Sequence, residues 1–151
     1  MQRKFLGAVT ALALSSTISF QALADTTPED AADYRGAVMT ALRGHIGASS
    51  MIVRGLVEDD GHLAIHAAGL AETSKELDRV FQEGSNVGES EALPVIWEEP
   101  EEFAAAIKET QEATAAFLAA AESGDSEAIA AAFRGVGMSC RGCHDRFRAG
   151  D

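Results

Sequence analysis

Apolar residues recur at three- and four-residue spacing in four separate stretches of this 151-residue chain, and this repeat constrains the fold most. Such spacing forms one apolar stripe along a helix, and the stripe needs other helices to cover it. No stretch alternates convincingly with period two, as a half-buried strand would. The sequence therefore predicts an all-α protein, a four-helix bundle.

Residues that favour helix ends bound the four stretches. The expected helices cover residues 28–57, a stripe from Leu63 to Phe81 that ends at Gly84, a stretch opened by Pro100 and stopped by Gly124, and a last stretch from Asp125 to Phe147. Residues 84–99 form a long connection that contains apolar side chains, among them Trp97. Apolar groups in a connection indicate that it covers something.

The first 24 residues are expected to be a signal peptide, which leaves a single domain over residues 25–151. Arg3 and Lys4 precede a short apolar run, and residues 22–24 read Ala-Leu-Ala, a typical cleavage site. The run is too short for a membrane span, although an uncleaved anchor is the alternative. Export of this kind indicates the periplasm, and no membrane insertion is expected after cleavage.

The mature chain is strongly acidic. The whole sequence has a net charge of −12, and loss of two basic residues with the leader makes it −14. Such a surface repels nucleic acid and anionic lipid, so neither is an expected partner. Paired carboxylates, a hydrolytic triad and a phosphate loop do not stand out, so no enzyme is predicted.

Residues 140–144 read Cys-Arg-Gly-Cys-His, the C-x-x-C-H signature of covalent attachment of one haem c. In a helix, Cys140, Cys143 and His144 fall within an arc of about 100°. Two sulfurs can then bond the haem vinyl groups while the imidazole binds the iron. A zinc site, a redox C-x-x-C and a disulfide are the alternatives. The first lacks a second ligand pair, the second normally follows a strand, and the third fits poorly inside a helix.

The sequence resembles the class II c-type cytochromes, that is, the cytochrome c prime group and its low-spin relatives. The resemblance rests on the run Tyr-Arg-x-Ala-Val-Met-Thr-Ala-Leu-x-Gly-His at 34–45, on Ala-Leu-Pro-x-Ile-Trp at 92–97 and on Cys-x-x-Cys-His-Asp-x-Phe-Arg at 140–148. It covers essentially the whole mature chain. It implies an antiparallel four-helix bundle with covalently bound haem between the first, third and fourth helices, and His144 as proximal ligand.

The resemblance places Met39 opposite the iron, and two functions follow from what Met39 does. A thioether ligand would give a low-spin His/Met haem suited to single-electron transfer with redox partner proteins. A Met39 that only packs on the porphyrin would leave an open iron, able to bind the gases NO or CO for scavenging or sensing. We expect ligation by Met39, with gas binding as the alternative.

Other residues are expected around the haem. Arg35 lies one turn before Met39, and its family counterpart contacts a propionate; Arg148 lies one turn after His144, where the family carries an arginine. Their alternatives are a solvated arginine and a cation at a helix end. Trp97 is expected either to line the haem pocket or to pack elsewhere in the core. Tyr34, Phe103, Phe117, Phe133 and Phe147 are expected in the core.

The remaining expectations concern the other histidines and the surface. His45 is expected to pack or to lie near the propionates, whereas His62 and His66 are expected in solvent. The resemblance implies a possible homodimer through the first two helices, where small residues would allow close packing: Ala67, Ala68 and Ala71. A basic cluster on the last helix could steer a redox partner, or pair locally with acids: Arg134, Arg141, Arg146 and Arg148.

Overall fold

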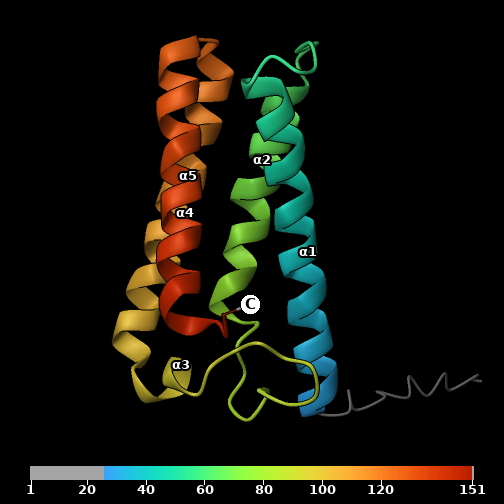
Figure 1. Cartoon of the computed structure of the whole chain (residues 1–151), viewed down its shortest axis with the longest axis vertical. Helices are drawn as coiled ribbons and strands as arrows, with labels where there is room; N and C mark the ends of the chain where they lie inside the picture. Colours follow the sequence, from blue (N-terminus) through green and yellow to red (C-terminus); the bar gives the residue numbers. More distant parts are fainter. Residues whose placement is uncertain (1–25, 151) are drawn as a thin grey trace, which may run out of the picture.

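The computed structural model describes residues 26–150, and it is a bundle of four long helices with short helical segments between them (Figure 1). The elements are α1 (Pro28–Val53), α2 (His62–Ser74), η1 (Lys75–Asp78), α3 (Val95–Glu98), α4 (Pro100–Ser123) and α5 (Ser126–Phe147). Within residues 26–150 the only β-type pairing is an isolated antiparallel bridge between Ala92 and Arg148. The all-α class and the four-helix bundle are therefore confirmed. The expected leader, residues 1–24, lies outside the described residues.

Side-chain caps start the helices where the sequence indicates. The Thr27 hydroxyl accepts a hydrogen bond from the backbone amide of Asp30 at 3.1 Å, and Pro28 occupies the first helical position of α1. The Asp125 carboxylate accepts hydrogen bonds from the backbone amides of Glu127 and Ala128 at 2.9 and 3.1 Å and so caps α5. Each cap satisfies backbone donors that have no partner within the helix.

Two helices end earlier than their apolar stripes predict. The helix α1 stops at Val53, not at residue 57, because Gly55 adopts a positive φ of 67° and the amides of Gly55 and Leu56 turn back to Ile52 O and Met51 O at 2.8 and 2.9 Å. The second stripe leaves the α-helix at Ser74 and continues as the 3₁₀ segment η1. Phe81 therefore lies beyond the helix that was expected to carry it. The apolar patch in the expected 84–99 connection contains one helical turn, α3.

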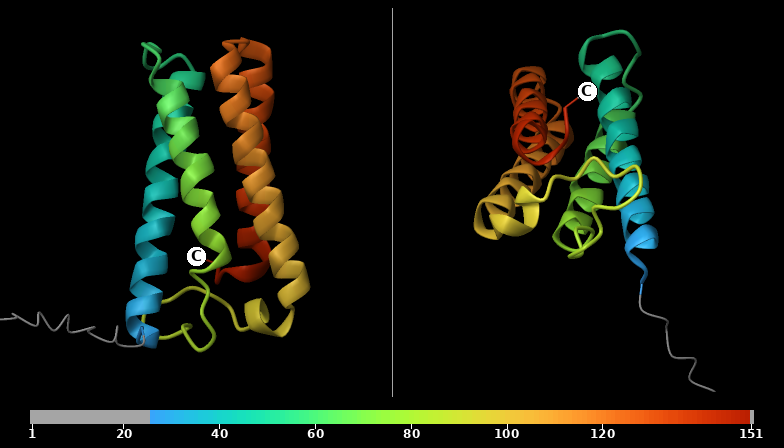
Figure 2. Two further views of the ribbon diagram at one scale, coloured as in Figure 1. Left: turned by 180° about the vertical axis from the view of Figure 1, so that it is seen from behind. Right: turned by 60° about the horizontal axis from the view of Figure 1, so that its bottom comes forward.

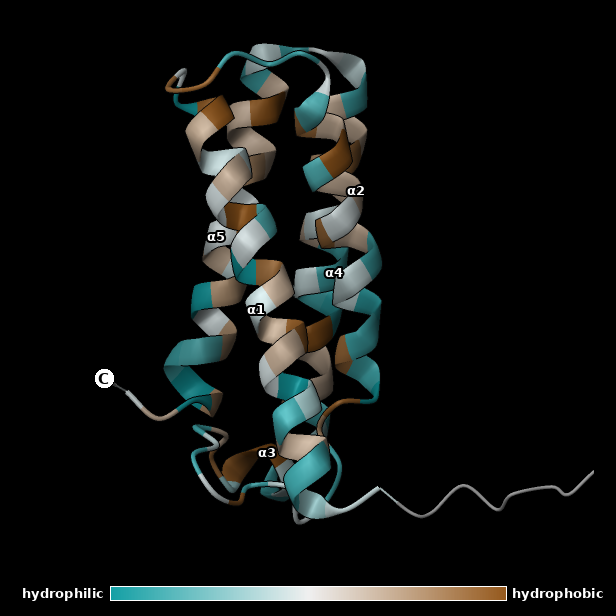
Figure 3. Cartoon of the chain, turned by 90° about the vertical axis from the view of Figure 1, so that its right-hand side faces the viewer, coloured by the Kyte–Doolittle hydropathy of each residue, from teal (hydrophilic) through white to brown (hydrophobic). Residues whose placement is uncertain are grey.

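Long helices pack in sequence, α1 on α2, α2 on α4 and α4 on α5, whereas α1 and α5 meet only slightly. Figure 2 shows the two helix pairs from behind and tilted. The fully buried centre of the bundle includes Leu70, Phe117 and Val136. Apolar residues gather on the inward sides of the helices in Figure 3. The core thus lies mainly between helices that pack in this order, and α1 and α5 share little of it.

The 79–94 connection crosses the end of the bundle where α1 begins and α5 ends (Figures 1 and 2). Its last residues are tied to the end of α5, since the Leu93 amide donates to Phe147 O at 3.0 Å and the Ala149 amide donates to Glu91 O at 2.8 Å. Phe81, Phe103 and Phe147 form an edge-to-face chain beneath it, with ring centroids 4.7 and 5.0 Å apart. The connection therefore covers this end of the bundle without filling the space between the helices.

Candidate haem site

A cavity of about 760 Å³ lies between α1, α4, α5 and the 79–94 connection. Its wall on α5 carries Cys140, Cys143 and His144, and its wall on α1 carries Met39 together with Leu42 and Ile46. Other lining side chains are apolar or come from the cavity rim: Leu77, Phe81, Ile96, Phe103, Ile107, Phe147, Arg35, Arg43 and Arg148. Cavities of this size hold organic cofactors in many proteins.

The C-x-x-C-H motif lies on the last turns of α5, where the helical repeat turns its three side chains toward the same space. Both thiols are half-buried and are not joined in a disulfide. Burial raises the pKa of the Cys140 thiol, and burial with the neighbouring Cys140 raises the pKa of Cys143 to about 11. The thiols are therefore protonated at neutral pH, which disfavours a reactive redox pair.

The surroundings of His144 favour its neutral form. Loss of water around the ring and then the charge of Arg148 lower the pKa of His144, against smaller opposing effects of Asp145 and Glu91. A neutral imidazole has a free nitrogen lone pair, which is the form that binds a metal. Two thiols and an imidazole beside one large, mostly apolar cavity fit a covalently held porphyrin.

The buried Arg35 fixes the 79–94 connection. Its guanidinium, only 5% exposed, donates to Val80 O and Ser85 Oγ from Nη1 and to Ser85 O and Ser90 Oγ from Nη2, over 2.6–3.3 Å. It also lies over the Phe81 ring, 5.3 Å from the centroid. Arg35 is therefore not the solvated arginine of the alternative interpretation. It lines the cavity, but both of its terminal nitrogens already hold the connection.

Arg43, one turn after Met39 on α1, is the basic residue that the sequence analysis missed. It lines the cavity and its side chain is exposed, so it has more freedom than Arg35 to meet a propionate at the rim. Its position, four residues from Met39, was the available signal. Arg148 also lines the cavity, and its Nε donates to Glu91 Oε2 at 2.6 Å.

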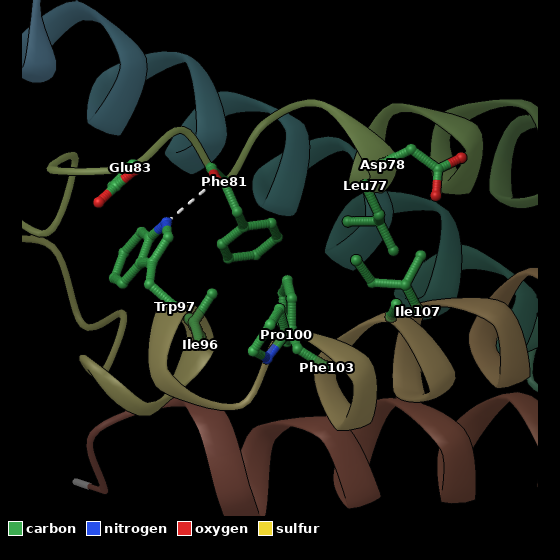
Figure 4. A pocket seen from close by; sticks show the side chains of 10 residues that line it. Leu77, Asp78, Phe81, Glu83, Ile96, Trp97, Pro100, Phe103 and Ile107 are labelled. Carbon is green, nitrogen blue, oxygen red and sulfur yellow. Dashed lines mark hydrogen bonds between the residues drawn. The ribbon is translucent and has the colours of Figure 1, made fainter.

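Trp97, expected either to line the haem pocket or to pack elsewhere in the core, does not line this cavity. It lines a smaller neighbouring pocket of about 410 Å³ with Phe81 and Phe103, and its indole nitrogen donates to Phe81 O at 3.2 Å (Figure 4). The physical reason is that α3 holds the indole behind Phe81, whose own ring lies between the two spaces and lines both. The alternative of a tryptophan packed elsewhere is the one the geometry favours.

Other residues also depart from expectation. Tyr34 is 46% exposed and not in the core, because its hydroxyl donates to Glu76 at 2.8 Å and accepts from Arg79 at 2.9 Å. His66 is half-buried against His45, not solvated, and neither ring lines the cavity. Ala67 and Ala71 are buried inside the bundle, so they are not free to pack against a second copy.

Local ion pairs occupy most of the basic cluster on α5. Arg141 pairs with Asp145 at 3.5 Å, Arg146 with Glu99, and Arg148 with Glu91. The interpretation of local pairing therefore describes these three residues better than a basic patch for a redox partner.

Comparison with known proteins decides the family. A family model described as cytochrome C' matches residues 30–148. The chain belongs to the cytochrome c' family. A cytochrome c' from Rhodospirillum rubrum is 32% identical over 142 residues, covering 93% of this chain and 95% of the relative. The family binds covalently attached haem c, so this chain is a haem protein.

Solved structures agree with the fold and are informative about ligands. A nitric oxide complex of a cytochrome c prime variant from Alcaligenes xylosoxidans has a TM-score of 0.76 and 31% identity, covering 82% of this chain and 98% of that one. A carbon monoxide-bound variant from the same organism has a TM-score of 0.77, 31% identity and the same coverage. Within residues 26–150, no helix is both long and apolar enough to cross a membrane.

Proposed function

We propose that this protein binds small neutral gases, with nitric oxide and carbon monoxide as the ligands to test, on the Met39 side of its haem. The carrying observation is the α1 wall of the cavity, where Met39 lies with the aliphatic Leu42 and Ile46, although Thr40 and Arg43 of α1 also line the space. The aliphatic side chains offer a polar ligand no hydrogen bond, whereas a diatomic gas needs none. The similar structures that hold NO and CO support the same interpretation.

Each residue of the site has an assigned part in this proposal. Cys140 and Cys143 tether the porphyrin through thioethers, and His144 binds the iron from the α5 side. The haem, when bound, would supply the iron that binds the gas. Met39, on the α1 wall that faces the α5 motif, would pack against the haem without bonding to the iron and would have to move aside for a gas. No residue in the proposal performs catalytic turnover.

Electron transfer through a His144/Met39 axial pair is the second candidate function. It is favoured by one observation, that a thioether from α1 lines the same cavity as the His144 imidazole. Electron transfer would require redox partner proteins. An iron bound by both His144 and Met39 would leave no position for a gas.

Absorption spectra of the reduced, haem-loaded protein separate the two functions. Gas binding predicts a broad, unresolved α band that changes when CO is added, and faster CO binding, by about tenfold or more, in Met39→Ala. The control is Met51→Ala, on the same helix but 48% exposed and away from the cavity. A sharp α band with no response to CO, converted to a broad one by Met39→Ala, would instead establish ligation by Met39, as the electron-transfer function requires.

We also propose the periplasm as the location, on the basis of residues 1–24 and the thioether-forming motif. Mass spectrometry of the purified protein tests this directly. The expected chain begins at Asp25 and carries the added mass of one haem. A chain that begins at residue 1 would contradict the expected cleavage.

A further inference from the structure

His45 of α1 and His66 of α2 face each other on the side of the bundle away from the haem cavity. Their Nδ1 atoms are 3.2 Å apart, and both rings are half-buried. The ring centroids are 5.5 Å apart with planes tilted by 56°, so the rings meet through their nitrogens and are not stacked. Neither ring takes part in the site described above.

The separation of the two nitrogens matches that of two ligands on one metal ion. Zinc binds imidazole nitrogen at about 2.0–2.1 Å in tetrahedral geometry, which sets two ligand nitrogens about 3.3–3.4 Å apart. The observed 3.2 Å is a hydrogen bond between the two Nδ1 atoms, and its length lies close to this value, so a metal ion that displaces the shared proton would need little change in the nitrogen separation. Imidazole is also the ligand that zinc and its neighbours in the first transition row prefer among nitrogen donors.

Gly69 provides the space for this arrangement. A Cβ atom at position 69 would lie 2.4 Å from Cε1 and 2.7 Å from Nδ1 of His45, closer than atoms can approach. The His45 ring can therefore take its place beside His66 only because residue 69 has no side chain. The contact between His45 and His66 therefore also depends on Gly69 of α2.

We propose that His45 and His66 form a two-histidine binding site for a divalent transition-metal ion of the zinc class. Water would complete the coordination, since residues 26–150 contain no group of three or more His, Cys, Asp or Glu placed to hold a metal. The acidic chain, with a net charge of −12, attracts cations to its surface. This site is independent of the haem and of the proposed gas binding.

Calorimetric titration of the haem-loaded protein with zinc chloride tests the proposal. One zinc ion per chain is expected, and His45→Gln and His66→Gln should each weaken binding by about tenfold or more. His62→Gln distinguishes this site from a rival His62–His66 site on α2 alone, because His62 is exposed and lies one turn from His66 on the same helix. No zinc binding by the wild type, or an equal loss in His62→Gln, would overturn the site.

Gly69→Ala keeps every histidine and breaks only their arrangement. The added methyl group should turn the His45 ring away and weaken zinc binding by about tenfold or more, while helix content and haem absorption stay unchanged. This variant decides the question if a glutamine variant fails to fold. Wild-type zinc affinity in a folded Gly69→Ala protein would mean that the ion binds elsewhere, and the proposal would be wrong.

Discussion

At the scale of single residues, Arg35 shows how one buried cation can organise a whole connection. Its four hydrogen bonds run to Val80, Ser85 and Ser90, which otherwise belong to a segment without regular structure. Burial alone lowers the pKa of Arg35, yet a guanidinium stays charged at any ordinary pH. Its donors therefore remain matched to acceptors, and their loss would leave buried acceptors without partners.

We expect Arg35→Ala to lower the free energy of unfolding by about 2–4 kcal/mol, because buried hydrogen bonds to a charged group are lost together. Urea unfolding of the haem-loaded protein measures this. Arg54→Ala, at an exposed position on the end of the same helix, should change stability by no more than about 0.5 kcal/mol. Equal effects of the two substitutions would contradict the role given to Arg35.

The sequence patterns predicted which residues gather at the site better than they predicted which other residues those side chains contact. The motif spacing placed Cys140, Cys143 and His144 on one side of α5, because helical periodicity is a local property. The partners of Arg35 and Trp97 lie 45–55 and 16 residues away, and such contacts depend on packing that spacing does not encode. The pairing of His45 with His66 depends on Gly69, three residues further along α2, in the same way.

At the scale of elements, helix starts were easier to predict than helix ends. Thr27, Pro28 and Asp125 act through bonds within three residues, so the sequence shows them directly. The second stripe continues apolar past Ser74, but there the Ser74 hydroxyl bonds to Ala71 O and Thr114 Oγ1 and the backbone tightens into η1. Apolar periodicity alone does not distinguish an α-helix from the 3₁₀ turn that follows it.

The cap of α5 should contribute measurably to stability. Asp125→Ala removes the acceptor for two backbone amides and is expected to cost about 1 kcal/mol. Asp125→Ser, which keeps a capping oxygen, should recover most of this. Thermal unfolding of the three proteins followed by circular dichroism tests the ranking, and an Asp125→Ala protein as stable as the wild type would contradict it.

The junction between the 79–94 connection and α5 should respond to acid. The hydrogen bond from Arg148, followed by the charges of Arg148 and His144, holds the pKa of Glu91 below its usual range. A depressed carboxyl pKa contributes stability above the ordinary pKa of about 4.3, and this contribution is lost as the pH falls below it. The side chains are partly exposed, so the contribution is small.

Glu91→Gln should therefore lower stability relative to the wild type at pH 7, and the difference should be smaller at pH 3. Urea unfolding midpoints at the two pH values measure it. Glu89→Gln, two residues earlier on the connection, is the matched control and should show no comparable difference between the two pH values. A Glu91→Gln effect that persists unchanged at pH 3 would rule out the pair as its source.

At the scale of the whole molecule, the cavity is the part of the bundle interior that the protein's own side chains do not fill. At about 24 cal/mol per Å³, a space of 760 Å³ corresponds to about 18 kcal/mol, more than the 5–15 kcal/mol that stabilises a typical domain. The cavity is partly open to water, so only a part of that cost applies. The space between the helices therefore weakens the bundle when it is unfilled, and a group that fills it with apolar contacts should stabilise the fold.

We therefore expect Cys140→Ala/Cys143→Ala, exported and purified without haem, to lose its cooperative unfolding transition. Differential scanning calorimetry and limited proteolysis should both show this. Met138→Ala, beside the motif but 70% exposed, serves as the control and should unfold like the wild type. A sharp transition near the wild-type temperature in the double variant would mean that the bundle is stable without its cofactor.

The bridge between Ala92 and Arg148 has a practical consequence for anyone who handles this protein. It ties the final described residues to the rim of the cavity, and α1 also begins at that end. A bulky label on the residues around Arg148 would therefore lie beside the cavity. The turn at Gly124, at the opposite end, is the better attachment point for an electrode or a sensor chip, because it would leave the entrance facing the solution.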